Sequence, residues 1–373
     1  MPFVQFDMER WMSKFEQKVD YNLSESGVHP VKLSELLERA PGLEERLLKA
    51  ELNYPYVNGN PELRERIAAL YPGATADNVL VTVGAAEANF ITATTLAGPG
   101  DEVVVMLPNY MQIWGIAHNH GMHVRSFHLR EEDGWRADLA ELEEAVGPDT
   151  KFIAVCNPDN PTGHIMSSGE MEGIVRAAAR VGAWIIADEV YAGAERERDE
   201  ITPSFWGRYD RVVAIGSLSK AYGLPGLRIG WVVAPRELID EIWARHEYVA
   251  ISVTMLSNIL AAVALSEEVR PWLIARARDY IRRGFPVLQA WMDKHPGVFS
   301  LIPPQAAAIA FVRYHLDVNS SELADRLRQE KSVLIVPGDH FGMDGFLRIS
   351  FGLPHDYLTG GLDRIGELIA QLS

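Results

Sequence analysis

The sequence predicts an α/β fold, in which helices sandwich the mainly parallel mixed sheet of a large domain and a smaller α/β domain is attached. The first observation is a series of short apolar runs between residues 78 and 235: NVLVTVG, EVVVMLP, FIAVCNP, AWIIADEVY, RVVAIGSLSK and RIGWVVAP. Strands that are apolar on both sides are typical of parallel sheets covered on both faces. The second observation is that amphipathic segments such as SSGEMEGIVRAAARVG separate most of these runs, as in an α/β sheet.

A change in the sequence pattern after Pro235, from short apolar runs to long helical stretches, predicts the second domain. Long helical stretches follow, and then the segments FSLIPPQAAAIAFVRY, SELADRLRQEK, SVLIVPG and FLRISFG again combine strands with a helix. The first 45 residues or so lack the alternation of apolar strands and amphipathic helices seen between residues 78 and 235. We therefore expect them to pack on the C-terminal part of the chain. We therefore predict a large domain over residues 45–286 and a small domain formed by residues 1–44 and 287–373.

The composition excludes several classes of function. The 373 residues carry a formal net charge of −16, whereas nucleic acid is bound by clustered Lys and Arg, so no nucleic-acid partner is expected. No apolar run approaches the roughly 20 residues that span a bilayer, and the N-terminus lacks the pattern of a secretory signal. The single cysteine, Cys156, cannot form an internal disulfide and is expected in the core, which suits a reducing cytoplasm.

Polar clusters follow several of the expected strands. GAAEA, PNY, NPDNPTG, DEVY and SLSK each come directly after an apolar run. Ligands of mainly parallel sheets bind outside the carboxyl ends of the strands, so these clusters are the candidate site.

Lys220 is the only lysine between Lys151 and Lys294, and it lies among serine, glycine, proline and apolar residues in GSLSKAYGLPGLRIGW. The glycines there lack the spacing of a dinucleotide-binding loop. We interpret Lys220 as a nucleophilic amine that forms an imine with a carbonyl cofactor. Ser217, Ser219 and Arg228 would then bind the phosphate of that cofactor.

The pattern S-x-S-K followed by P-G-L-R-x-G, with eight positions from lysine to arginine, resembles that of the class I/II aminotransferases. These are enzymes of PLP-dependent transferase fold type I that require pyridoxal 5′-phosphate (PLP). Further matches occur in the family's order, so the resemblance covers nearly the whole chain. It implies transfer of an amino group between an L-amino acid and a 2-oxo acid, through a Schiff base on Lys220 and without a metal.

The resemblance also implies roles for residues around the cofactor. Backbone amides of Gly84, Ala85 and Ala86 would bind the phosphate at a helix start, although this stretch is equally compatible with close packing. Tyr110 would stack on the pyridine ring, its alternative being a core residue. Asp188 would keep the pyridine nitrogen protonated. Asn160 and Tyr191 would donate hydrogen bonds to the phenolic oxygen, although Asn160 could instead mark a simple turn.

Two further matches concern the substrate and a second subunit. Arg348 would clamp the substrate's α-carboxylate through two parallel hydrogen bonds; a core salt bridge is the alternative. Tyr54 would reach the phosphate of the neighbouring subunit's cofactor, which implies a homodimer; a packing tyrosine in a turn is the alternative.

The loop YNLSESGVHPV departs from many relatives at Ser26 and Gly27, which we expect to touch substrate. It is similar to that of capreomycidine synthase-like enzymes, so a PLP-dependent lyase, cyclase or oxidase is the alternative function. A PLP-sensing DNA-binding regulator is disfavoured by the acidic charge.

The GAAEA stretch departs from some relatives too. Those that take aspartate carry a lysine where Ala86 aligns, so a dicarboxylic substrate is less expected here. Glu25 and Glu87 could attract a cationic side chain instead, and Met111 and Trp114 could wall an apolar one, although an ordinary structural role is the preferred interpretation of each.

Overall fold

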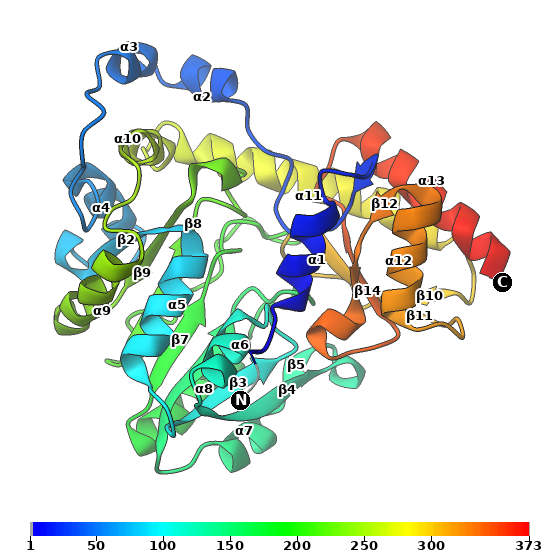
Figure 1. Cartoon of the computed structure of the whole chain (residues 1–373), viewed down its shortest axis with the longest axis horizontal. Helices are drawn as coiled ribbons and strands as arrows, with labels where there is room; N and C mark the ends of the chain where they lie inside the picture. Colours follow the sequence, from blue (N-terminus) through cyan, green and yellow to red (C-terminus); the bar gives the residue numbers. More distant parts are fainter. Residues whose placement is uncertain (1–2, 373) are drawn as a thin grey trace.

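Eight strands form the central sheet of the large domain in the computed structural model, which describes residues 3–372 (Figure 1). The sheet mixes both orientations: the five strands β8, β7, β6, β3 and β4 are parallel, whereas β9 pairs antiparallel with β2 and β8, and β5 pairs antiparallel with β4. The mainly parallel mixed sheet expected from the sequence is confirmed. In spatial order the strands are β2 (Val79–Val83), β9 (Ile229–Val233), β8 (Val212–Ser217), β7 (Trp184–Asp188), β6 (Thr150–Cys156), β3 (Glu102–Leu107), β4 (His123–Arg130) and β5 (Arg136–Ala137).

Helices cover both faces of this sheet, as strands that are apolar on both sides require. The helices α5 (Gly84–Leu96), α6 (Gln112–Asn119) and α9 (Arg236–Val249) share one core with side chains from one face. The helices α7 (Leu139–Ala145) and α8 (Ser168–Val181) share another core with the opposite face. The end of the sheet that β2 and β9 form is covered by α4 (Pro61–Ala68) and α10 (Met255–Ala264).

The small domain contains a second sheet, in which every pair of strands is antiparallel. Its order is β10 (Phe299–Ser300), β11 (Ile309–Tyr314), β14 (Phe346–Ser350) and β13 (Val336–Pro337). The helices α12 (Ser320–Lys331) and α13 (His355–Leu372) pack beside it (Figure 1).

The N-terminal segment lies with this small domain, although it is far away in sequence. Strand β1 (Tyr21–Asn22) pairs in parallel with β12 (Val333–Leu334), and α1 (Asp7–Phe15) contacts β13. Helix α1 lies between the two domains (Figure 1). Helix α1 thereby contributes side chains to the candidate site.

The helix α11 (Arg270–Met292) links the two domains and packs against α13. Pro286, the predicted end of the large domain, lies inside this 23-residue helix, so no element ends at that boundary. The division into residues 45–286 and two terminal segments stays a prediction. The remaining elements are α2 (Leu33–Arg39), α3 (Leu43–Leu48) and the short 3-10 helices η1 (Ala76–Asn78), η2 (Glu131–Asp133), η3 (Pro225–Leu227) and η4 (Gly338–Phe341).

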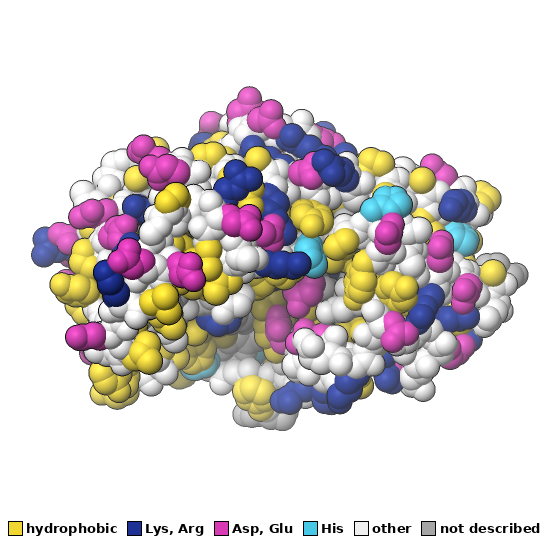
Figure 2. Space-filling view, turned by 90° about the horizontal axis from the view of Figure 1, so that it is seen from above, with side chains coloured by type: hydrophobic (Ala, Val, Ile, Leu, Met, Phe, Trp, Pro, Cys, Tyr) yellow, Lys and Arg dark blue, Asp and Glu magenta, His cyan; other side chains and the backbone are white. Residues whose placement is uncertain are grey.

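The surface carries both signs of charge. Figure 2 shows Lys and Arg side chains interspersed with Asp and Glu over the visible face, with hydrophobic side chains between them. Within residues 3–372, every helix is too short or too polar to cross a membrane.

Candidate active site

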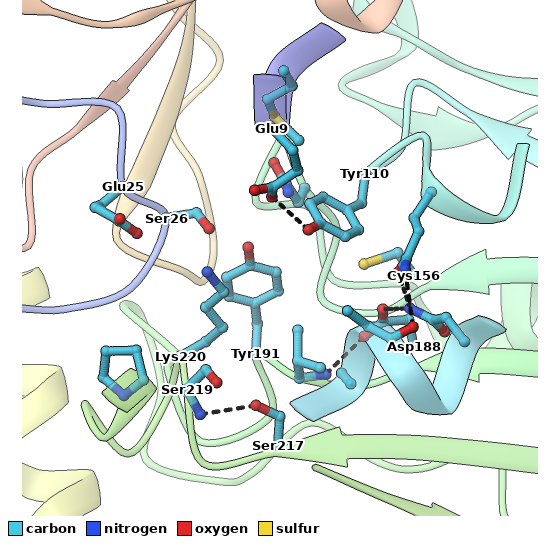
Figure 3. Close-up of a pocket in the computed structure, with 18 of the residues that line it drawn as sticks. Glu9, Glu25, Ser26, Tyr110, Cys156, Asp188, Tyr191, Ser217, Ser219 and Lys220 are labelled. Atoms are coloured by element: carbon cyan, nitrogen blue, oxygen red, sulfur yellow. Dashed lines mark hydrogen bonds between the residues drawn. The ribbon is translucent and has the colours of Figure 1, made fainter. Parts of the chain in front are cut away.

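A cavity of about 430 Å³ lies beyond the carboxyl ends of β6, β7 and β8 and is closed from the other side by the N-terminal segment (Figure 3). Its walls come from both domains. The lining residues predicted from sequence are Ser26, Ala85, Ala86, Tyr110, Asn160, Asp188, Tyr191, Ser217, Ser219, Lys220, Arg228 and Arg348. Because parallel strands end at one edge of a sheet, clusters that are far apart in sequence meet here.

One side of the cavity can bind an anion. Helix α5 begins there at Gly84, so the amides of its first turn have no partner within the helix. Ser219 donates its amide hydrogen to Ser217 Oγ over 2.8 Å, and Arg228 Nη1 donates to Ser219 Oγ over 3.4 Å. Two hydroxyls, a guanidinium and a helix N-terminus therefore surround one position, which is suited to a phosphate.

The glycine at the start of α5 brings the guanidinium close. Gly84 has φ +73°, and a Cβ built on it would lie 2.3 Å from Arg228 Nη2. On the adjacent strand β9, a Cβ on Gly230 would lie 2.4 Å from the Ala85 nitrogen. Both positions need glycine because larger residues would push this side of the cavity apart.

Asp188 ends β7 at the floor of the cavity, and its side chain is buried. It accepts hydrogen bonds from Asn89 Nδ2 over 3.0 Å and from the Val190 amide over 3.2 Å, both neutral groups. Burial raises the pKa of the Asp188 carboxyl, although these hydrogen bonds and the charge of Lys220 oppose the shift. A buried carboxylate with neutral partners favours a cationic ligand group beside it.

Lys220 projects into the cavity near Tyr191 (Figure 3). Burial lowers the pKa of its amine, and the nearby charges of Glu25 and Arg348 act in opposite directions on it. Burial raises the pKa of the Tyr191 hydroxyl, and Arg348 and Ser26 oppose that shift. An amine with a lowered pKa is more often neutral and hence nucleophilic.

Arg348 enters the cavity from β14 of the small domain and is 1% exposed. Its Nη1 donates to Asn160 Oδ1 over 3.0 Å, and its Nη2 donates to the Ser24 carbonyl over 2.5 Å. The sulfur atoms of Met8 and Met12 on α1 pack against the same guanidinium. Its Nε has no partner among the described residues, and none of its hydrogen-bond acceptors is a carboxylate. This arrangement differs from the core salt bridge that was the alternative.

Three predicted residues do not line the cavity. Gly84 lies beneath Arg228, and Gly27 packs against the lysine segment, where a Cβ on it would lie 3.1 Å from the Ser219 carbonyl oxygen. Tyr54 is 83% exposed in the loop before α4, away from the cavity of its own chain.

Two of the suggestions about substrate side chains are wrong. Glu87 is buried outside the cavity, where it accepts from the Val83 amide over 2.6 Å and contacts His246 Nδ1 over 2.8 Å. Its carboxylate holds the start of α5 and does not face a ligand. Met111 and Trp114 line a neighbouring, much smaller cavity, so they do not wall the main one.

Several lining residues were missed from the sequence. Met8, Glu9 and Met12 come from α1, and Glu16 follows it directly. Asn89 lies one helical turn after Ala85. Residues four positions apart share a helix face, and this spacing could have predicted that Asn89 also faces the cavity. Cys156, expected as core, is buried and also lines the cavity.

The residues present fit PLP. The phosphate matches the hydroxyls, guanidinium and helix start; a protonated pyridine nitrogen matches buried Asp188; and the aldehyde matches Lys220. Tyr110 lines the cavity with one edge against Phe6 and its hydroxyl on Glu9 Oε1 at 2.5 Å.

Comparison with known proteins gives the same assignment. The sequence model of "Aminotransferase class I and II" matches residues 29–365. Capreomycidine synthase of Streptomyces vinaceus is 32% identical over 371 residues, covering 96% of this chain and 92% of that protein. Aspartate aminotransferase of Streptomyces avermitilis is 28% identical over 340 residues, covering 85% and 82%.

A solved structure is similar as well. The crystal structure of a PLP-dependent aminotransferase from Streptococcus suis superimposes with a TM-score of 0.94 at 31% identity, covering 100% of this chain and 99% of that one. The likeness confirms PLP-dependent transferase fold type I and PLP as the cofactor. The chain thus belongs to the class I and II aminotransferase family of PLP-dependent enzymes.

Proposed function

We propose that this enzyme transfers an amino group between an L-amino acid and a 2-oxo acid. The observation that carries the proposal is that Lys220, Asp188 and Arg348, from three different strands or strand ends, all face one cavity. They supply an amine, a buried carboxylate and a buried guanidinium, which are the groups that an amino acid and PLP together require.

Each residue around the cofactor would have its own task. PLP, when bound, supplies an electron sink for the bonds at the substrate's Cα. Asp188 would hold a proton on the pyridine nitrogen, and Tyr191 and Asn160 would donate to the phenolic oxygen. Lys220 would bind the cofactor's aldehyde and, once the substrate amine displaces it, would remove the proton from Cα as a general base.

Arg348 would orient the substrate. Its fork of N–H groups suits a carboxylate, and its free Nε leaves a donor for it. Burial lowers the pKa of the Arg348 guanidinium, while Tyr191, Glu25 and Glu9 oppose that shift, so a substrate carboxylate would complete its surroundings.

The experiment is a set of absorption spectra of the PLP-loaded enzyme before and after adding single L-amino acids without any oxo acid. Transamination predicts conversion of the cofactor to its amine form with release of one oxo acid for each site. Reduction with borohydride should fix the cofactor on Lys220, which mass spectrometry of peptides locates. Absence of bound PLP after reconstitution would contradict the proposal.

The alternative is a lyase, cyclase or oxidase, and the similarity to capreomycidine synthase favours it as the second candidate. The loop containing Ser26 and Gly27 lies against Lys220, so it is placed to alter the step after removal of the Cα proton. Ammonia release, or a cyclised or oxidised product with the cofactor recovered as PLP, would identify this chemistry.

We also propose a cytoplasmic homodimer in which Tyr54 reaches the partner's cofactor phosphate. Support comes from the exposure of Tyr54 together with that of Leu48, Leu52, Tyr56 and Tyr248. Mixing Lys220→Ala and Tyr54→Phe subunits tests it. A mixed dimer would have one site with both residues intact and would regain activity, whereas a Tyr54 acting within its own chain predicts no gain.

A further inference from the structure

Three carboxylates stand together at the mouth of the cavity. Glu9 lies on α1, Glu16 follows the end of that helix, and Glu25 lies in the loop after β1; all three line the cavity. Glu9 and Glu25 approach it from two different sides, and the Lys220 side chain extends toward the space between them (Figure 3). Of the ion pairs formed within residues 3–372, none includes any of the three.

The carboxylates are close enough to affect one another. Burial raises the pKa of the Glu16 carboxyl, and the nearby charges of Glu25 and Glu9 raise it further. Like charges that share a site in this way destabilise one another, and either uptake of a proton or a cation between them relieves the repulsion.

Among the described residues of this chain that line the cavity, none is left to supply this cation. Its basic residues are Lys220, Arg228 and Arg348, which the proposed function assigns to the aldehyde, the phosphate and the substrate's α-carboxylate. Of its four acidic residues, Asp188 is assigned to the pyridine nitrogen. Once PLP and an α-carboxylate are bound, only Glu9, Glu16 and Glu25 are left without an opposite charge.

The position of Arg348 indicates how a bound amino acid would be oriented in the cavity. Arg348 is 1% exposed and keeps an unpartnered Nε, and the charges of Glu25 and Glu9 both act on it. An amino acid whose carboxylate binds Arg348 therefore lies within reach of these carboxylates. Glu9 already accepts from the Tyr110 hydroxyl through Oε1, which leaves Glu16 and Glu25 as the main acceptors.

Resting on the proposed function, we propose that the amino donor carries a cationic side chain, a guanidinium or a primary ammonium group, which Glu16 and Glu25 bind with Glu9 beside them. A donor with a second carboxylate is disfavoured, because that carboxylate would face Glu9, Glu16 and Glu25 at this end of the cavity.

The first test measures binding without chemistry. The deamino analogues of arginine and citrulline have the same shape and lack the α-amine, but only the first is cationic. We expect calorimetric titration of the PLP-loaded enzyme to give binding of deamino-arginine at least roughly tenfold tighter than that of deamino-citrulline. Glu16→Gln and Glu25→Gln should each reduce this ratio by about tenfold, whereas Glu172→Gln on the exposed side of α8 should leave it unchanged.

The ratio between the analogues is the readout because Glu25 also acts on Lys220. Any general effect of a variant on the site changes both analogues alike and cancels in the ratio. Equal affinity for the two, or a ratio that both Gln variants preserve, would overturn the proposal.

The second test uses the half-reaction. Arginine against citrulline tests the guanidinium, and lysine against norleucine tests the ammonium group; the cationic member of at least one pair should react faster by roughly tenfold or more. Faster reaction of neutral or acidic amino acids would overturn this inference and leave the proposed function standing. An enzyme that bound no PLP would contradict the proposed function, and the analogue titration of the protein as isolated would still decide on the cation site.

Discussion

Asn89 Nδ2 donates a hydrogen bond to Asp188 Oδ2 over 3.0 Å in the buried floor of the cavity. Asn89 belongs to α5, whose first turn faces the expected phosphate, and Asp188 ends β7. One helix would therefore both provide amides for the phosphate of PLP and orient the carboxylate that holds its pyridine nitrogen.

Replacing Asn89 by Ala should slow the half-reaction by roughly tenfold to a hundredfold, since a hydrogen bond to a buried charged group contributes about 1.5–3 kcal/mol. Loss of the bond removes one of the groups that oppose the raised pKa of Asp188, so the carboxyl would be ionised less often. Stopped-flow absorbance measures the rate. Thr94→Ala, on the same helix but bonded only within it, is the control and should change little. An unchanged rate in Asn89→Ala would show that Asp188 needs no such support.

Gly230→Ala should weaken PLP binding and lower the melting temperature. Its Cβ would lie 2.3 Å from the Gly84 carbonyl carbon and 2.4 Å from the Ala85 nitrogen, so β9 and the start of α5 would have to separate. Overpacking of this kind costs about 1–3 kcal/mol. Thermal unfolding and PLP titration measure both effects, and Gly226→Ala is the matched control because its Cβ would meet no atom within 4 Å. The prediction is wrong if the two variants behave alike.

Arg348→Lys should keep PLP bound and raise KM for the amino donor. Lysine retains the charge but loses the planar fork that binds a carboxylate through two hydrogen bonds. We expect an increase in KM of at least roughly 30-fold, because loss of a buried charged partner costs about 2 kcal/mol or more. Steady-state kinetics with a saturating oxo acid give KM, and Arg326→Lys on α12 is the control. A KM near that of the wild type would assign the α-carboxylate to another residue.

Glu170 predicts a pH dependence of stability. It accepts from the Ala137 and Ser167 amides, each over 2.8 Å, and contacts His164 Nε2 over 3.0 Å. Burial raises the pKa of its carboxyl, but these partners outweigh burial and lower the pKa to about 2, from a usual value of 4.5. Because the pKa is lower in the folded state, the resulting stability is fully present above about pH 4.5 and is lost as the pH falls toward 2.

We therefore expect Glu170→Gln to melt below the wild type at pH 7, by the equivalent of about 1–3 kcal/mol. The difference should shrink as the pH is lowered from 4.5. Differential scanning of both proteins at each pH separates this effect from the titration of other groups, with exposed Glu172→Gln as the control. A difference that stayed constant with pH would mean that the substitution acts through packing alone.

Much of the site could be predicted from the sequence because of how parallel sheets are built. Lys220, Asp188 and Asn160 follow apolar strands, and the strand ends meet at one edge without any need for side-chain detail. The motif around Lys220 also carries its own candidate phosphate ligands within a few positions. Residues that follow different strands in the sequence therefore lie close together in the fold.

Other contacts were hidden because they join segments that only tertiary packing brings together. Met8 contacts Arg348 across 340 positions, and α1 presents the amphipathic pattern of any surface helix, so neither Glu9 nor Glu16 could be assigned to a cavity. Glu87 is the opposite case. It belongs to the GAAEA motif, whose Ala85 and Ala86 line the cavity, but its own carboxylate contacts His246 on α9.

The sequence by itself thus determined the fold class, the cofactor and most of the candidate residues that line the cavity, because each depends on short motifs placed at strand ends. Only the tertiary structure decided which carboxylates line the cavity. A helix exposes side chains in every direction, and the direction that becomes a cavity wall is set by the neighbouring domain against which the helix packs.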